Sequence, residues 1–335
     1  GSKMTAEGLE SYFDMRDISV MGIIEPLLNL RKLLKLRKGL KKYLLQQNPD
    51  IFIGIDSPDF NLPVANFLKK NLQIKTVQYV SPSVWAWRKG RIKSMERSID
   101  SVLTLFPFEE TAYSNSKIKT CYVGHPLSYK IDINNMEIES KVQNSIALLP
   151  GSRKSEIDIL MPILLEFINL MNKNYEDFVF IFHATKDHYK LINSFIKTKD
   201  YKNCEIISDD KIKAHTLKKS VFAIAKSGTV SLEICKCKIP SIILYKMNLL
   251  NYLIVKSLVK VKFANIINIA AGKEIIPELL QSNCNPKNLF KQVSSFINDP
   301  NKIKDQVNKT QSILNQFKTS TPSVELASKA LSKFL

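Results

Sequence analysis

The sequence predicts an α/β fold of two Rossmann-like, doubly wound domains. Short apolar runs rich in β-branched residues alternate with segments of helical spacing along most of the 335 residues, a pattern typical of strand–helix–strand units around a parallel sheet. A polar interval over residues 129–144 interrupts this alternation, which then starts again. At 44% hydrophobic residues, the chain has enough apolar surface for two cores. We therefore expect one domain over residues 1–144 and another over residues 145–300.

Each expected strand is a short apolar run that ends near a turn or helix signal. In the first domain we expect strands near residues 51–56, 76–80, 101–106 and 120–123, and a helix over 62–71. In the second we expect strands near residues 145–149, 178–183, 204–207, 221–225 and 240–245, each followed by a helical segment. The last helices are expected over residues 286–298 and about 302–334.

The charge balance favours an anionic partner. Lys and Arg number 49 against 31 Asp and Glu, a formal charge of +18, which suits nucleic acid, a phosphorylated substrate or acidic lipid. No helix-turn-helix, aromatic RNA platform or zinc pattern accompanies this charge. We therefore expect no nucleic-acid partner.

Cysteine usage and hydropathy indicate a cytoplasmic protein. The 5 cysteines include no CxxC pair, and their odd number argues against a disulfide framework. No carboxylate or thiol is arranged to complete a ligand set with His183 and His188, so neither a metal nor another cofactor is expected. The longest uncharged run, the 12 residues between Lys75 and Arg88, is shorter than the roughly 20 residues that span a bilayer. We recognise no signal peptide and expect catalysis to face the cytoplasm.

The segment IFIGIDSPDFN, residues 51–61, predicts a catalytic edge in the first domain. Its apolar run is typical of a buried parallel strand, and it brings Asp56 and Asp59 to the carboxyl end of the sheet, where open α/β sheets bind ligands. Pro58 stiffens the turn, and the Asn61 amide can hydrogen-bond a bound molecule. Asp56 is our candidate general base, with Asp59 and Asn61 as substrate-binding residues. A helix cap or a turn former is the alternative for such an Asp.

Two segments of the second domain suit a nucleotide. LPGSRKSEI, residues 149–157, places Gly151, Ser152 and Arg153 between an expected strand and an expected helix. We expect Ser152 to cap this helix, whose free N–H groups then point at the ligand, and Arg153 to contact phosphate. A plain strand-to-helix turn with a solvated Arg is the alternative. The second segment, Ser-Gly-Thr at residues 227–229, is by itself a weak motif and more often a cap.

Five segments occur in one order along the chain: IFIGIDSPDFN (51–61), YVSPSVWAWR (79–88), LPGSRKSEI (149–157), SGTVSLE (227–233) and NIAAGKEIIPELLQ (268–281). This ordered set resembles lipid-A-disaccharide synthase, a family of inverting glycosyltransferases with the two-domain GT-B fold. The resemblance extends from MGIIEPLLNLRKLLKLR (21–37) to about residue 285. It implies that the two domains face one cleft and that the helices of residues 301–335 pack back toward the first domain.

The resemblance implies transfer from UDP-2,3-diacylglucosamine to 2,3-diacylglucosamine 1-phosphate, which gives the β-1,6-linked disaccharide 1-phosphate and UDP, a step of lipid A synthesis. Asp56 would take the proton of the acceptor's 6-hydroxyl, while Arg153 and the helix N-terminus at residue 152 assist the departure of UDP. Glu233 would accept hydroxyl hydrogens from the ribose. The other substrate-binding candidates of the second domain are Gly151, Ser152, Glu156, Ser227, Gly228, Thr229, Asn268, Gly272, Glu274 and Gln281.

Residues 26–49 form a basic amphipathic segment. Its leucines follow helical spacing and its other positions are rich in Lys and Arg with no acid among them, which suits an anionic membrane surface. A Rossmann helix that buries its leucines against the sheet is the alternative. Because the implied substrates carry acyl chains, we expect a peripheral inner-membrane protein, and a homodimer is an open alternative. The membrane-facing candidates are Ile24, Leu27, Leu30, Leu33 and Leu34.

Trp85, Trp87 and Arg88 cluster in the second of the matching segments. Tryptophans in such a place are most often core residues, and an acyl-sugar pocket is the functional alternative.

The chain departs from the family at its start. In the family a first strand, a glycine-rich turn carrying a glutamate, and a first helix precede the segment matched here by residues 1–8. We expect this unit to be missing, with UDP affinity kept and transfer weak, because an incomplete sheet does not hold Asp56 to the roughly 0.5 Å that catalytic groups need. Two alternatives follow: a poorly active chain that binds nucleotide or membrane, or another UDP-sugar-dependent GT-B enzyme, which the DSPDFN and SPSVWAWR segments disfavour.

Overall fold

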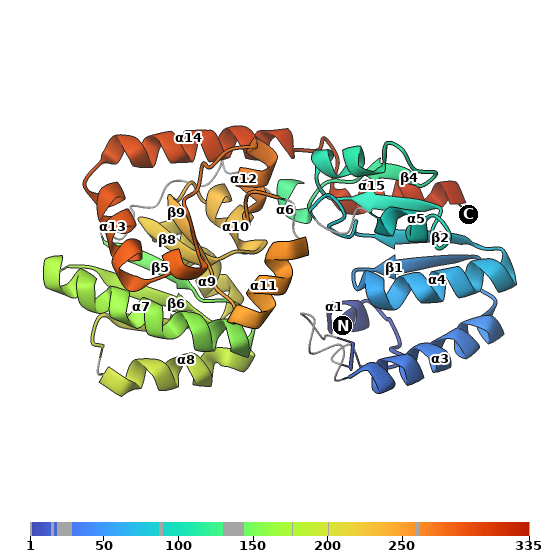
Figure 1. The fold of residues 1–335 in the computed structure, drawn as a ribbon, viewed down its shortest axis with the longest axis horizontal. Coiled ribbons are helices and arrows are strands. Elements are labelled where there is room, and N and C mark those ends of the chain that lie inside the picture. The colour runs from blue at the N-terminus through green and yellow to red at the C-terminus, as the bar shows by residue number, and fades with distance from the viewer. Residues whose placement is uncertain are drawn as a thin grey trace. The chain divides into compact units, whose positions relative to one another are not determined.

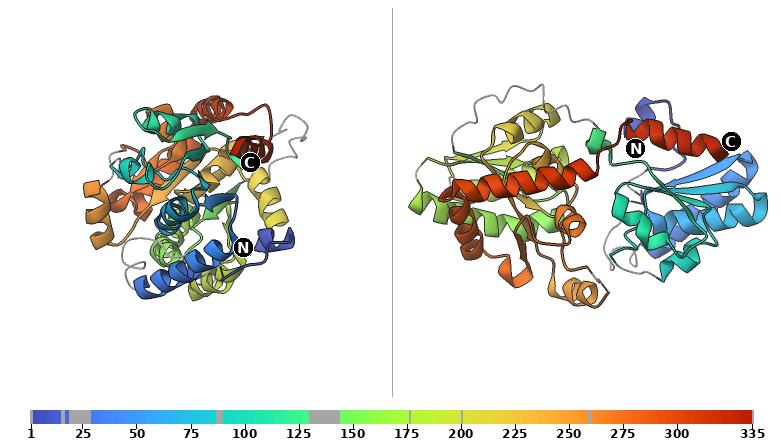
Figure 2. Two further views of the ribbon diagram at one scale, coloured as in Figure 1. Left: turned by 90° about the vertical axis from the view of Figure 1, so that its right-hand side faces the viewer. Right: turned by 90° about the horizontal axis from the view of Figure 1, so that it is seen from above.

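The computed structural model describes residues 2–14, 17–18, 29–86, 90–129, 144–175, 177–199, 201–258 and 261–334. The chain divides into two compact units, each of which is an α/β structure (Figures 1 and 2). The first unit comprises Gly1–Tyr129, Leu250–Lys260 and Thr319–Leu335, and the second comprises Lys130–Leu249 and Val261–Lys318. Both units contain a parallel sheet flanked by helices, so the expected fold class of two Rossmann-like domains is confirmed.

The sheet of the first unit has four parallel strands in the order β1-β2-β3-β4. They are β1 Ile51–Ile55, β2 Lys75–Tyr79, β3 Ser101–Thr104 and β4 Lys119–Tyr122. All four residues of β3 are buried, as expected for a central parallel strand with both faces covered. Among the described strands, β1 pairs only with β2, and its Ile53 and Ile55 are 36% and 50% exposed.

Helices cover both faces of this first sheet. On one face, Leu62 and Ala65 of α4 pack with Val102 of β3. On the other, Ala330 of α15 packs with Leu103, the next residue of β3, because successive strand side chains point to opposite faces. The last helix of the chain therefore completes the core of the first unit. The helical elements are α1 Ser2–Ala6, α3 Leu30–Gln47, α4 Pro58–Leu72, α5 Arg91–Met95, η2 Pro107–Tyr113, α6 Pro126–Tyr129, α11 Leu249–Leu258, α15 Ser323–Leu331 and η7 Ser332–Phe334.

The second unit is built on six parallel strands in the order β10-β9-β8-β5-β6-β7. They are β5 Ser145–Leu149, β6 Val179–His183, β7 Cys204–Ile207, β8 Phe222–Lys226, β9 Ser241–Tyr245 and β10 Glu278–Leu280. Its helical elements are α7 Lys154–Asn174, η4 Lys186–His188, α8 Tyr189–Ile196, η5 Lys197–Lys199, α9 Asp210–Lys219, α10 Val230–Lys236, α12 Ile266–Ala271, η6 Gln281–Asn283, α13 Pro286–Ile297 and α14 Pro300–Gln316.

The main core of the second unit lies between this sheet and the helices α7, α8 and α13. Phe167 of α7, Phe180 of β6 and Phe296 of α13 are among its largest fully or almost fully buried side chains. The long helix α14 packs instead on α10 and α12. Its Gln306 is buried, and it accepts a hydrogen bond from the Ser241 N–H at 2.7 Å and donates one to the Ser241 carbonyl at 3.1 Å. This amide fixes α14 to the first residue of β9.

The predicted strands coincide with β1 to β9 within two residues at each end. Sequence reasoning missed β10, which has only three residues. The expected continuous helix over residues 302–334 is wrong, because α14 ends at Gln316 and α15 begins at Ser323. Pro322 has no N–H with which to continue a helix, and the Thr319 hydroxyl donates to the Thr321 carbonyl at 2.7 Å inside the break.

Replacing Ala330 by Asp is expected to unfold the first unit at a lower temperature. Ala330 is 7% exposed against Val77, Leu103 and Val123, so an aspartate there would be a buried charge without a partner. We expect the melting temperature to fall by on the order of 10 °C. Val324 lies on the same helix and is 76% exposed, so Val324→Asp is the matched control. Equal melting temperatures for the two variants would contradict the packing of α15.

Candidate active site

The strand order of the second unit has a switch point between β5 and β8. Strands β5 and β8 are neighbours, but β5 leads through α7 to β6 on one side, whereas β8 leads through α10 to β9 on the other. The chain connections therefore diverge between β5 and β8, and open α/β sheets bind ligands at such a switch point, beyond the carboxyl ends of the strands. The loops after β5 and β8 contain residues 150–153 and 227–229, which belong to the two segments that we predicted from the sequence to suit a nucleotide.

Glu156 joins the loop after β5 to the end of β8. Its Oε1 accepts from Arg153 Nη1 at 2.7 Å and forms an ion pair with Lys226 Nζ at 2.8 Å, and its Oε2 accepts from the Ser152 N–H at 3.2 Å. The side chains of Glu156 and Lys226 are only 14% and 20% exposed. Burial alone raises the pKa of Glu156, but the hydrogen bond and charge of Lys226, together with Arg153 and the Ser152 N–H, outweigh it and lower the pKa. Glu156 is therefore an anion at neutral pH.

The loop after β5 needs a glycine. Gly151 has φ +119°, a conformation that L side chains rarely adopt, and a Cβ at this position would lie 2.5 Å from Glu156 Oε2. The expected cap at Ser152 is wrong: Arg153 is the N-cap residue of α7, and no side chain caps the helix there. Ser152 instead donates its backbone N–H to Glu156. The carboxylate of Glu156, in the first turn of α7, therefore supplies the hydrogen-bond acceptor for this N–H group of the loop.

The loop after β8 is short and open. The Ser227 hydroxyl donates to the Ala264 carbonyl at 2.8 Å, and Thr229 is the N-cap residue of α10 without a side-chain cap. Among the described residues, no atom outside its chain neighbours lies within 4 Å of the Cβ position at Gly228. Glu233 lies on the first turn of α10. Partial burial raises the pKa of Glu233, although the charges of Lys213 and Lys236 act in the opposite direction. This loop thus leaves open space at Gly228, near the exposed carboxyl group of Glu233.

The polar residues of the 268–281 segment mostly hold their own loops. Asn268 is fully buried: its Nδ2 donates to the Ile276 carbonyl and to Glu278 Oε1, and its Oδ1 accepts from the N–H groups of Ile275 and Ile276. Gln281 bonds both backbone groups of Met247. Gly272 ends α12 with φ +65°, and Glu274 is exposed. Glu274 is therefore the member of this group whose side chain faces solvent.

In the first unit, Asp56 ends β1 in a left-handed conformation with φ +51°. Its N–H donates to the Tyr79 carbonyl at 2.6 Å, and its own carbonyl accepts from Asn61 Nδ2 at 2.7 Å and from Gln78 Nε2 at 2.9 Å. These three bonds fix the backbone of Asp56. Its carboxylate takes part in none of them and is exposed. Asn61 therefore positions Asp56 in this structure.

Asp59 is engaged differently from Asp56. It lies in the first turn of α4 and pairs with Arg91 Nη2 at 2.6 Å. Arg91 is 13% exposed and Asp59 76% exposed, so the carboxylate reaches solvent while it neutralises a nearly buried guanidinium. The two acids that the sequence placed together thus have separate surroundings.

An aromatic cluster lies on the segments that follow β2 and β3. Trp85 packs edge-on against Phe108, with ring centroids 5.1 Å apart, and its Nε1 donates to Glu109 Oε1 at 3.2 Å. Glu109 Oε2 also accepts from the N–H groups of Leu105 and Phe106, and burial raises the pKa of Glu109 despite these bonds. Trp85 is half-buried. Trp87 and Arg88 lie outside the described residues, as do Ile24 and Leu27 of the expected membrane face.

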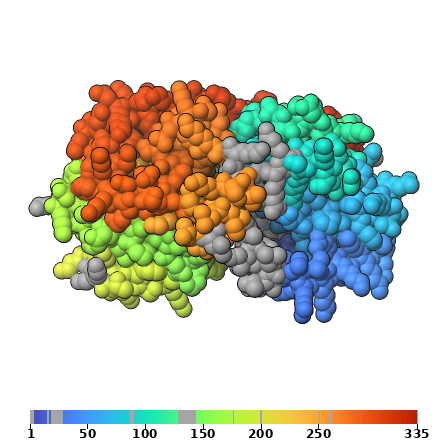
Figure 3. Space-filling model, in the orientation of Figure 1, coloured from blue at the N-terminus to red at the C-terminus, as the bar shows by residue number. Residues whose placement is uncertain are grey.

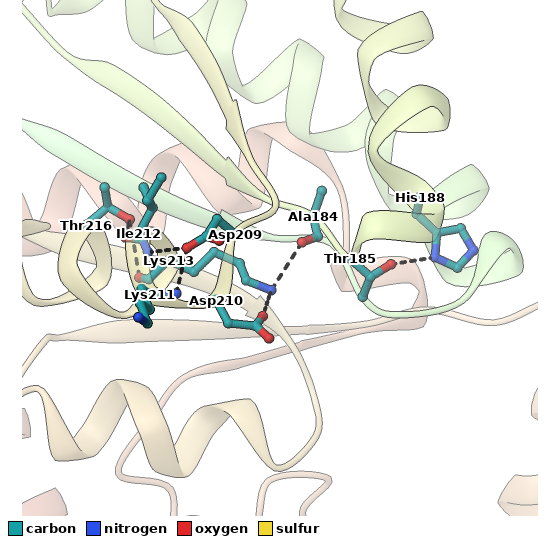
Figure 4. A network of polar contacts seen from close by, with 9 residues as sticks. All are labelled: Ala184, Thr185, His188, Asp209, Asp210, Lys211, Ile212, Lys213 and Thr216. Carbon is teal, nitrogen blue, oxygen red and sulfur yellow. Dashed lines mark hydrogen bonds and ion pairs between the residues drawn. The ribbon is translucent and has the colours of Figure 1, made fainter. Parts of the chain in front are cut away.

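Another polar network occupies the carboxyl ends of β6 and β7 (Figure 4). Lys213 of α9 pairs with Asp210 at 2.7 Å and donates to the Ala184 carbonyl at 3.3 Å, while the Thr185 hydroxyl contacts His188 Nδ1 at 2.8 Å. His183, which ends β6, is 7% exposed, and its Nε2 has no hydrogen-bond partner among the described residues. Burial, and then the charge of Lys213, lowers the pKa of His183 to about 4.

Metal ligands are not grouped in this region or elsewhere in the described parts of the chain. There, no three His, Cys, Asp or Glu side chains lie close enough together to hold a metal ion.

Two Rossmann-like units in one chain define the GT-B class of folds, and solved structures show the same fold. S. aureus MnaA, in a co-structure with UDP, is similar with a TM-score of 0.65 and 13% sequence identity, covering 100% of this chain and 87% of that chain. MurG of Acinetobacter baumannii is similar with a TM-score of 0.58 and 11% identity, covering 98% of this chain and 86% of that one.

Sequence comparison identifies the family. Residues 1–331 match the family described as lipid-A-disaccharide synthetase. The lipid-A-disaccharide synthase of Acinetobacter baylyi is 39% identical over 315 residues, which are 89% of this chain and 80% of that protein. The enzyme of that name from Idiomarina loihiensis is 37% identical over 309 residues, or 90% and 81% of the two chains. The chain belongs to the lipid-A-disaccharide synthase family, as the five ordered segments predicted.

Sequence reasoning missed two residues of these edges, Lys226 and Glu109, and considered His183 only as a metal ligand. Lys226 ends β8 and directly precedes Ser227. Its position as a cation next to the Ser-Gly-Thr segment could have identified it from the sequence. Glu109 is the third residue of η2 and accepts the Phe106 N–H at the start of this helix, so an acid just after Pro107 was the local signal available, whereas its contact with Trp85, 24 positions away, had none.

The buried, neutral His183 predicts a pH dependence of stability. The unfolded chain takes up a proton at His183 below about pH 6.5, whereas the folded chain does so only near pH 4. The free energy of unfolding should therefore fall as pH decreases through this interval, by on the order of 3 kcal/mol. The measurement is urea unfolding at several pH values for the wild type and His183→Leu, in which this part of the fall should disappear. His125 is present in both proteins, so it cancels in the comparison, and parallel curves would contradict the assignment.

Proposed function

We propose that the chain transfers a diacylglucosamine unit from UDP-2,3-diacylglucosamine to 2,3-diacylglucosamine 1-phosphate, which forms the β-1,6-linked disaccharide 1-phosphate and releases UDP. The observation that carries this proposal is the family match over residues 1–331. The test is to incubate the purified chain with both substrates and to detect the disaccharide 1-phosphate by mass spectrometry. UDP release without a disaccharide product would contradict the proposal.

The switch point of the second unit suits the UDP part of the donor. The first turn of α7 offers backbone N–H groups to an anion, and Arg153 is 44% exposed, so it can add a charge-assisted contact to the phosphates. Gly228 leaves room for close approach, and the accessible Glu233 can accept hydroxyl hydrogens from the ribose. S. aureus MnaA, similar in fold, has been solved with UDP, which supports a nucleotide at such a fold without fixing its position here.

Asp56 is the proposed general base. An inverting transfer needs a carboxylate that takes the proton from the attacking 6-hydroxyl, while dipoles and cations stabilise the departing UDP. Three hydrogen bonds to its backbone N–H and carbonyl hold Asp56 in place, and its carboxylate remains exposed. Asp59 is less suited to this task because it already pairs with Arg91.

The acyl chains of the substrates call for contact with a membrane surface, for which α3 is our proposed site. This helix forms part of the surface of the first unit, drawn in blue in Figures 1 and 3. None of its residues is fully buried, Leu30 and Leu34 are 45% and 47% exposed, and Leu33 is half-buried. In the described parts of the chain, no helix has both the length and the apolar character to cross a bilayer. Attachment by one helix face together with basic side chains fits these facts.

The variant Asp56→Asn is expected to fold and bind UDP like the wild type but to lose turnover by at least about 10²-fold. Asn is tolerated in the left-handed region, and the hydrogen bonds of residue 56 involve only its backbone. Only the ability to take a proton is removed. Turnover, UDP affinity and melting temperature are to be measured together, with Asp59→Asn as the control that should lose less. Full activity of Asp56→Asn, or a large drop in its melting temperature, would show that another residue is the base.

The combined change of Leu30 and Leu34 to Ser is expected to weaken sedimentation with vesicles that contain phosphatidylglycerol. Both side chains are largely exposed, so the melting temperature should stay near that of the wild type. Leu33→Ser is the matched control, because this half-buried leucine should affect stability more than vesicle binding. A lower melting temperature of the double variant with unchanged sedimentation would move the membrane contact to another surface.

A further inference from the structure

Lys226 is a nearly buried cation at the switch point to which the proposed transfer mechanism gives no role. Its Nζ lies 2.8 Å from Glu156 Oε1 and 5.3 Å from the centre of the Tyr245 ring. A carboxylate and an aromatic face thus hold the ammonium group from two sides. Its side chain is 20% exposed, less than half the exposure of Arg153.

Glu156 poses an electrostatic problem for an anionic ligand. Its carboxylate lies in the first turn of α7 and accepts the Ser152 N–H, beside the loop where a diphosphate would approach. An unpaired carboxylate here would repel the diphosphate and would compete with it for Arg153, whose Nη1 bonds Glu156 at 2.7 Å. The same carboxylate is nonetheless needed to hold the loop, so its charge has to be balanced by something other than Arg153.

We propose that Lys226 is a positioning residue for the nucleotide diphosphate and acts through Glu156. It balances the charge of Glu156 and keeps the carboxylate against the Ser152 N–H, so that Arg153 is free to turn its donors to the phosphates. This inference rests on the proposed function, because it assumes that the diphosphate of UDP binds at the switch point. It assigns the two cations of the cluster different tasks: Arg153 contacts the ligand and Lys226 contacts Glu156.

The two tasks can be separated by removing the charge of Lys226 alone and together with that of Glu156. In Lys226→Met the carboxylate keeps Arg153 as its counter-ion, so the affinity for UDP should fall by about tenfold or more. Lys226→Arg keeps the charge and should retain most of the affinity. In Lys226→Met combined with Glu156→Gln, the amide oxygen can still accept the Ser152 N–H and hold the loop, but no carboxylate is left to hold Arg153. The affinity should therefore return to near the wild-type value.

The experiment is isothermal titration of the full chain and these variants with UDP, and with uridine as a ligand that lacks the diphosphate. Uridine affinity should be the same in all four proteins, and melting temperatures identify any variant that folds poorly. Recovery of UDP affinity in the double variant, with uridine affinity and melting temperature the same in all four proteins, is the expected result. A purely structural role of Lys226 would also change the melting temperature or the uridine affinity of Lys226→Met, because it would leave Glu156 partly unpaired.

Three outcomes would overturn the inference. A double variant that stays as weak as Lys226→Met would mean that Lys226 contacts the phosphates itself. A Lys226→Met protein that binds UDP as tightly as the wild type would refute only the role of Lys226 and leave the proposed function in place. A wild-type chain that does not bind UDP would refute the proposed function and this inference together.

Discussion

The carboxylate of Glu156 is the constraint on which the ligand edge of the second unit depends. It receives Arg153 and the Ser152 N–H from the loop after β5 and Lys226 from the end of β8, so one side chain fixes the two loops that meet at the switch point. Partly buried charges of this kind depend on one another, because removal of one partner leaves the other unpaired in a poorly solvated place. The glycine at position 151 belongs to the same constraint, since any side chain there would displace the carboxylate.

The first unit uses neutral amides for a similar purpose. Gln78 and Asn61 both donate to the Asp56 carbonyl, and a Cβ at Gly54 would lie 2.8 Å from Gln78 Oε1 and 2.9 Å from Asn61 Cβ. The turn after β1 is thus held by side-chain amides that hydrogen-bond the backbone of the turn itself. In both units the turn is closed by protein groups, while the Asp56 carboxylate in one and part of the Arg153 side chain in the other stay exposed.

The sequence predicted the strands well because parallel strands covered on both faces are continuous apolar runs, as in residues 145–149 and 222–226. It predicted less well which polar side chains hydrogen-bond the protein itself and which stay available. Asn268 has the same polar character as a ligand-binding amide, yet all four of its hydrogen bonds are internal. Serine is a residue type that often caps helices, but here Glu156 accepts the hydrogen bond from the Ser152 N–H, and the Ser152 side chain caps nothing. The pairing of Glu156 with Lys226 joins residues 70 positions apart, and no local pattern predicts it.

The placement of α15 has a consequence for the order in which the protein is made. The strands of the first sheet lie within residues 51–122, but one face of this sheet is covered by residues 323–331. About 200 residues separate them, and at roughly 5–20 residues per second a ribosome needs on the order of 10 s or more to make that length. During this interval Val77, Leu103 and Val123 lack their final cover. The first sheet is therefore completed only after residues 323–331 are made, although its own strands are made long before them.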